Sequence, residues 1–177
     1  MKKILISILI TLICAGLFAQ EPVLSDGDVE RFILTFPEIT EELGALGQSL
    51  ENANGRLFLP WTVRTSEEVK RTFLDRGWDE GYFERVQLIL LGFSLILAES
   101  EMLTVMPDVQ EALDEIDSTP VSSYFTAEMK KQTRDMMVAA VRGMNQALYD
   151  ELDSIAPSDM EKIRAHKDEL TAFLKEL

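Results

Sequence analysis

The spacing of apolar residues predicts helices along almost the whole chain. Apolar side chains recur three and four residues apart in a short series, from Val29 to Phe36, and in a long one, from Met129 to Ile155, which follows a capping residue at Thr126. This spacing places side chains on one face of an α-helix. After residue 20, no segment shows the sustained alternation of apolar and polar residues that is typical of strands. The pattern therefore predicts an all-α fold, a single-domain helical bundle of about five to seven helices.

One predicted helix, at about 80–103, is apolar on nearly every side. Only Gln87, Gly92 and Ser94 interrupt its middle, residues 86–98. Such a stretch is too short to cross a bilayer, which needs about 20 apolar residues. We therefore expect this helix to be buried at the centre of the bundle.

Proline, glycine and capping residues predict where the helices begin and end. Pro37 either kinks the first helix or opens a second one that runs to about residue 51. Thr65 is expected to cap a later helix as part of a capping box, and Gly77 is expected to end that helix. Pro107 is expected to open a separate short acidic helix at 108–117.

Residues 1–19 have the order of a secretory signal peptide. Two lysines precede an apolar stretch, and Ala19 is the small residue after which cleavage is expected. Cleavage would leave 20–177 as a single acidic helical domain, exported in soluble form to the periplasm of a two-membrane bacterium. Two alternatives stay open: Cys14 as the acylated residue of a lipoprotein, and an uncleaved membrane anchor.

The charge of the chain excludes some partners. It has 17 basic and 31 acidic residues, so that without the two signal lysines its net charge is −16. Nucleic acids and anionic membrane surfaces would repel such a domain. We expect no stable membrane span after cleavage. Since residues 86–129 contain no Lys or Arg, a second envelope protein with a basic surface is the expected partner.

Residues suited to catalysis or metal binding are scarce. The only cysteine lies in the signal, and the only histidine, His166, has no nucleophile marked near it. Zinc prefers cysteine and histidine ligands, so no metal is expected. The sequence also has no phosphate-binding loop, and no cofactor is expected. We expect most methionines to fill gaps in the core rather than bind copper. Those considered are Met102, Met106, Met136, Met137 and Met144.

Two features are candidate binding surfaces. The first is a set of carboxylates in the region without cations, of which three share a helix face by their spacing of three and four. This set is Glu99, Glu101, Asp108, Glu111 and Glu115. The second is the apolar segment 57–61 with Phe58 and Trp61, which is either an exposed recognition surface or a buried flap over one end of the bundle.

These observations predict a non-catalytic exported protein that acts by binding, as a scaffold, an adaptor or a chaperone-like protein of the cell envelope. Two alternatives remain. One is a carrier of a small molecule or lipid, with an apolar cavity in the bundle. The other is a carboxylate-dependent hydrolase. The oligomeric state stays open.

Overall fold

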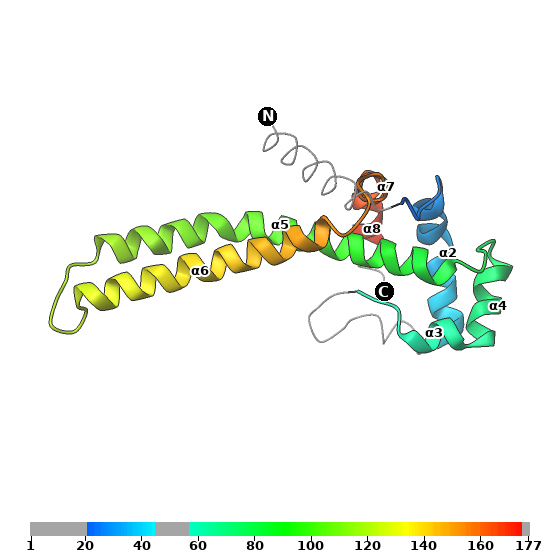
Figure 1. Ribbon diagram of the computed structural model, residues 1–177. Coiled ribbons are helices and arrows are strands. Elements are labelled where there is room, and N and C mark those ends of the chain that lie inside the picture. Colours follow the sequence, from blue (N-terminus) through cyan, green and yellow to red (C-terminus); the bar gives the residue numbers. More distant parts are fainter. Residues whose placement is uncertain (1–20, 45–56, 175–177) are drawn as a thin grey trace, which may run out of the picture. The chain divides into compact units, whose positions relative to one another are not determined.

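The described part of the chain is all helical, as the apolar spacing predicts. The computed structural model describes residues 21–44 and 57–174, and within them it contains seven helices and no strand (Figure 1). The helices are α2 (Asp28–Leu43), α3 (Trp61–Thr65), α4 (Glu67–Asp75), α5 (Tyr82–Ser118), α6 (Ala127–Leu152), α7 (Pro157–Ala165) and α8 (Lys167–Leu174). The predicted signal peptide, with Cys14, lies outside the described residues, as does the segment 45–56.

The chain divides into two compact units. The first comprises the described residues up to Ile96 and from Asp153 onward, and the second is Leu97–Leu152. Helix α5 contributes to both units, its first part to one and its second part to the other. The two units are therefore described separately.

A chain of aromatic side chains forms the centre of the first unit. Phe32 and Phe36 of α2 stack at 4.5 Å between ring centroids, and Phe173 of α8 meets Phe32 edge to face at 5.5 Å. Phe73 of α4 continues the chain and stacks on Tyr82 of α5 at 4.4 Å. Such pairs add to the stabilisation that burial of the rings already provides. Four helices thus share one core.

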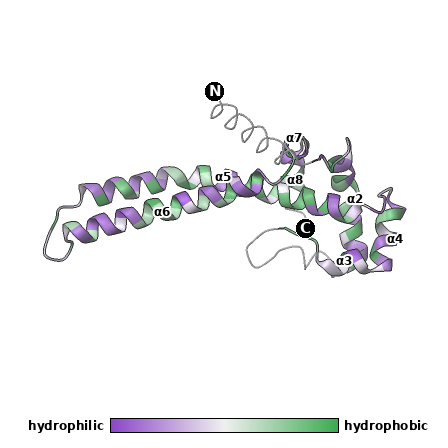
Figure 2. Cartoon of the chain, in the orientation of Figure 1, coloured by the Kyte–Doolittle hydropathy of each residue, from purple (hydrophilic) through white to green (hydrophobic). Residues whose placement is uncertain are grey.

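The first part of α5 is the most buried segment of this unit. All ten buried residues of this helix lie between Tyr82 and Ile96, where its ribbon is mostly hydrophobic (Figure 2). Among the described residues, α5 is also the one helix whose length and composition would let it cross a membrane, and 39% of its most apolar window is buried. The core helix of a folded domain can have the same composition, and the buried residues of α5 are all among residues 82–96.

The three residues that interrupt the apolar run of α5 are the points where other segments meet it. Gln87 accepts a hydrogen bond from the backbone N–H of Leu59 at 2.7 Å, and Ser94 accepts one from Leu57 at 3.0 Å. At Gly92, a Cβ atom would lie 2.5 Å from Cδ1 of Ile163 in α7. Two side chains thus bind the segment before α3, and one missing side chain admits α7.

Two predicted helix boundaries are wrong. Pro107 lies inside α5 and opens no separate helix, and Ser66, not Thr65, caps α4 by accepting from the N–H of Val69 at 3.4 Å. Pro37 likewise lies within α2. Both prolines are exposed, so water can reach the carbonyl groups that lose their helical partner and the helices continue. Gly77 ends its segment at φ 82°, as predicted.

The segment before α2 is fixed to α7. The carboxylate of Asp159, which is buried, accepts from the backbone N–H of Val23 at 2.8 Å and of Leu24 at 3.2 Å. The ammonium group of Lys162 donates to the carbonyl of Leu24 at 2.6 Å. The backbone at Val23 and Leu24 is therefore part of the folded first unit.

Candidate functional site

The second unit is a hairpin of two antiparallel helices, which we call the hairpin (residues 97–152). The end of α5 and the start of α6 are joined around Asp117, whose carboxylate accepts from Nε of Arg134 at 3.2 Å. Lys130 donates to the carbonyl of Asp117 at 2.6 Å and to that of Thr119 at 3.1 Å. Thr126 caps α6, as predicted, by accepting from the N–H of Met129 at 3.2 Å. These bonds fix the connection between the helices.

The hairpin exposes most of its apolar side chains. Leu148 is its only buried residue. Nine of the thirteen exposed large hydrophobic side chains among the described residues belong to it. They are Leu103, Val105, Met106, Val121, Tyr124, Met129, Met136, Met144 and Tyr149. The expectation that the methionines fill a core is wrong for Met106, Met136 and Met144, because two helices can cover only one side of each other.

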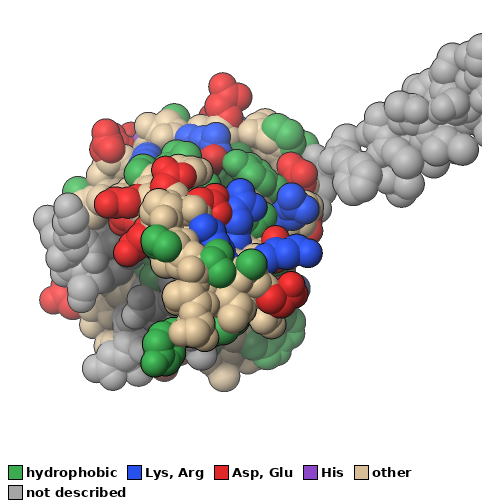
Figure 3. Space-filling view, turned by 90° about the vertical axis from the view of Figure 1, so that its left-hand side faces the viewer, with side chains coloured by type: hydrophobic (Ala, Val, Ile, Leu, Met, Phe, Trp, Pro, Cys, Tyr) green, Lys and Arg blue, Asp and Glu red, His purple; other side chains and the backbone are tan. Residues whose placement is uncertain are grey.

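The cations of the hairpin are confined to one of its two helices, whereas acidic residues lie on both. Glu101, Asp108, Glu111 and Glu115 are exposed on α5, and Glu99 is half-buried. The cations of the hairpin all lie on α6. They are Lys130, Lys131, Arg134 and Arg142. Seen from the loop end of the hairpin, lysine and arginine side chains gather together with hydrophobic side chains beside them (Figure 3).

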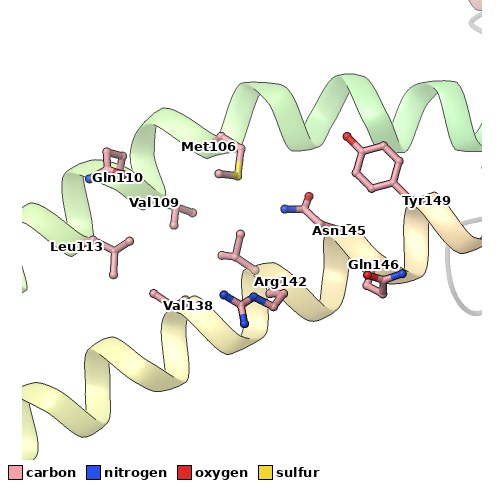
Figure 4. A pocket seen from close by; sticks show the side chains of 10 residues that line it. Met106, Val109, Gln110, Leu113, Val138, Arg142, Asn145, Gln146 and Tyr149 are labelled. Carbon is pink, nitrogen blue, oxygen red and sulfur yellow. The ribbon is translucent and has the colours of Figure 1, made fainter.

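A groove of about 330 Å³ separates the two helices over part of their length. Met106 and Leu113 of α5 point into this space toward Val138 of α6 (Figure 4). The groove is lined by Met106, Val109, Gln110, Leu113, Val138, Val141, Arg142, Asn145, Gln146 and Tyr149. Its walls therefore combine apolar side chains with four polar ones, of which Asn145 points into the space between the helices (Figure 4).

A second apolar surface on α6 lies outside the groove, and we call it the methionine stripe. Its members are all exposed, and their spacings of seven, four, four and three put them on one face of the helix. They are Met129, Met136, Ala140, Met144 and Ala147. None of them lines the groove. The hairpin thus has two apolar faces, the groove and the stripe.

The segment 57–61 belongs to the first unit and is held as a flap against α5. Leu59 is buried and Phe58 is half-buried, whereas Trp61 is 63% exposed at the start of α3. The guanidinium group of Arg64 lies 4.9 Å from the ring centre of Trp61, and Phe83 meets this ring edge to face at 5.9 Å. The predicted site residues therefore lie in two different units.

The described residues include no cluster of His, Cys, Asp and Glu that could hold a metal ion. The side chain of Arg85 and the backbone N–H of Gly81 donate to Asp79, and these bonds lower the pKa of its carboxyl group. A general acid of a hydrolase would need the opposite shift. Burial raises the pKa of Tyr82, whose hydroxyl donates to the carbonyl of Val63 at 2.9 Å. Asp79 thus binds Arg85 and the backbone at Gly81, and Tyr82 packs in the core of the first unit.

A second gap, beside α5 in the first unit, is lined by Phe32, Ile89, Phe93 and Phe173 among others and has no room for a water molecule. A carrier cavity at this place would need the core to open. The groove of the hairpin is the larger space.

The fold and the exposed surfaces define an all-α protein with an apolar, acidic helical hairpin. The chain matches no protein-family model, no curated protein and no solved structure. Its function is therefore argued from its own residues.

Proposed function

We propose that this chain is a non-catalytic exported protein that binds other proteins of the bacterial cell envelope, in an adaptor or chaperone-like role. The observation that carries the proposal is the concentration of exposed apolar side chains on the hairpin. Apolar side chains gathered on an exposed helix face, as in the methionine stripe, are typical of sites of protein interaction. Segment 1–19 supports the proposed export.

The composition of the hairpin favours partners that are apolar and basic. The methionine stripe offers flexible, polarisable side chains, which adapt to partners of different shape. Helix α5 adds exposed carboxylates without a cation between residues 86 and 129, and these attract positive charge. A partly unfolded basic protein presents both features.

The proposal is tested with a reduced, denatured basic protein, such as lysozyme, whose aggregation is followed by light scattering. The chain without its signal peptide should suppress aggregation. The variant Met136→Glu/Met144→Glu should lower the affinity about fivefold or more, the equivalent of about 1 kcal/mol. Its control is Leu34→Glu, at an exposed position of the first unit. Equal suppression by both variants would count against the hairpin as the binding surface.

One observation favours a second candidate, the carrier of a small apolar ligand. The groove volume of about 330 Å³ lies at the lower end of the range for ligand pockets, about 300–1,000 Å³. Native mass spectrometry of protein purified without detergent tests this candidate, since a carrier should retain extra mass. A bare polypeptide mass would argue against it.

A further inference from the structure

The hairpin lacks the core that a pair of helices needs. Of residues 97–152 only Leu148 is buried, and part of the space between α5 and α6 is the groove. Most of the stability of helices in proteins comes from packing of an apolar face. Antiparallel helices can complete such a core in a bundle of four. The groove face is therefore an incomplete half of such a core.

Each helix of the hairpin has a set of three residues, spaced seven and four apart, along its side of the groove. On α5, Leu103, Gln110 and Asp114 lie seven and four residues apart, and Leu103 is 70% exposed. On α6, Lys131, Val138 and Arg142 have the same spacing. Gln110, Val138 and Arg142 line the groove, so each set follows one edge of it. The α5 edge therefore carries Asp114, and the α6 edge carries two cations, Lys131 and Arg142, together with one acid, Asp135, so its net charge is positive.

These charges are not neutralised by ion pairs within the described residues. Asp114 accepts from Nε2 of Gln110 at 2.8 Å and forms no salt bridge there. Lys131 and Arg142 form none either in the described part of the chain, and both are exposed. The acidic edge of one hairpin thus complements the basic edge of an identical hairpin.

We infer that the groove face binds the groove face of a second copy of this chain and forms an antiparallel four-helix bundle. A twofold axis parallel to the helices places α5 of each copy against α6 of the other, with Asp114 of one facing Lys131 of its partner. Every neighbouring pair of helices is then antiparallel. The inference rests on the proposed role of the hairpin as a binding surface, and it leaves the methionine stripe free for other proteins.

The size of the face is sufficient for a stable dimer. Residues 97–118 extend over about 33 Å at a rise of 1.5 Å per residue, and two helices side by side are about 20 Å wide. Two such faces bury about 1,300 Å² in total, within the range of about 1,200–2,000 Å² for stable specific interfaces.

Sedimentation velocity of the chain without its signal peptide tests the dimer at about 100 µM, where a dimer with micromolar Kd is almost complete. The wild type should sediment as a dimer, and Leu103→Lys should sediment as a monomer because it places a cation opposite the cations of the partner's basic edge. The matched control is Met136→Lys, at a position that is 66% exposed on the stripe, and it should remain dimeric. A monomeric wild type, or the same behaviour of both variants, overturns the inference.

Charge exchange tests the orientation of the two copies. Asp114→Lys alone and Lys131→Asp alone should each weaken the dimer at least about fivefold, and the double variant should regain most of the loss. Circular dichroism confirms that each variant keeps its helices. A double variant weaker than both single variants would exclude this pairing.

Different experimental results would overturn the proposed dimer and the proposed function. A monomeric wild type that suppresses aggregation through the methionine stripe overturns the dimer and supports the proposed function. A dimer that binds no denatured protein supports the dimer and overturns the chaperone-like role. Native mass spectrometry that shows a monomer with a bound small molecule assigns the groove to that ligand and overturns the dimer.

Discussion

At the scale of the residue, the polar interruptions of an apolar helix decide how the first unit closes. Gln87 and Ser94 each accept a backbone N–H from the segment 57–61, and Gly92 leaves room for Ile163. A buried N–H group without a partner costs more than a typical hydrogen bond contributes. These positions therefore fix the flap against α5, and its apolar side chains add burial.

Replacement of Gln87 by Leu should destabilise the first unit. The substitution leaves the N–H of Leu59, which is buried, without its acceptor, and a loss of about 1–3 kcal/mol is expected. Urea unfolding followed by circular dichroism measures this loss. The control is Gln132→Leu, at an exposed position of α6, where a change below about 0.5 kcal/mol is expected. Equal losses would show that the bond to Leu59 contributes little.

At the scale of the element, two glycines in helix interiors have opposite roles. A Cβ atom at Gly92 would meet Cδ1 of Ile163 at 2.5 Å and the sulfur of Met160 at 3.2 Å, and both side chains are buried. A Cβ atom at Gly143 of α6 would have nothing within 4 Å. Glycine at position 92 thus permits close packing of α5 against α7, whereas no other side chain packs against α6 at Gly143.

The two glycines predict opposite effects of one substitution. Gly92→Ala should lower the free energy of unfolding by about 1–3 kcal/mol, because the packed core must shift. Gly143→Ala should raise the stability of the hairpin by about 0.5–1 kcal/mol, because alanine favours the helix. Thermal unfolding and amide exchange of the two segments measure the effects. The same sign in both variants would contradict this account of the packing at Gly92.

At the scale of the whole molecule, the fold limits where a signal peptide could be cleaved from the chain. The backbone of Val23 and Leu24 is bonded to Asp159, so a signal peptidase needs its site before this point. Expression in a two-membrane bacterium, followed by intact mass measurement of the envelope fraction, tests the site. A chain that begins at residue 20 is expected, with 158 residues. A start after residue 23, or an acylated Cys14, would contradict soluble export by this route.

The sequence by itself determined the all-α class, several helix boundaries and the separation of charge. Helical periodicity and caps such as Thr126 involve residues that are neighbours along the chain, and they can therefore be recognised without the fold. Charge follows directly from composition. The spacing of apolar residues does not, however, mark the division between the two units at Ile96.

Only the tertiary structure decided which apolar faces are buried. Phe32 and Phe36 lie four residues apart on one helix face, as Ala140 and Met144 do, yet the first pair is buried and the second is exposed. The difference lies in what packs against each helix: α2 contributes to a core shared by several helices, whereas α6 has one neighbour within the hairpin. Burial depends on contacts between segments distant in sequence, and local spacing carries no information on how many such segments meet.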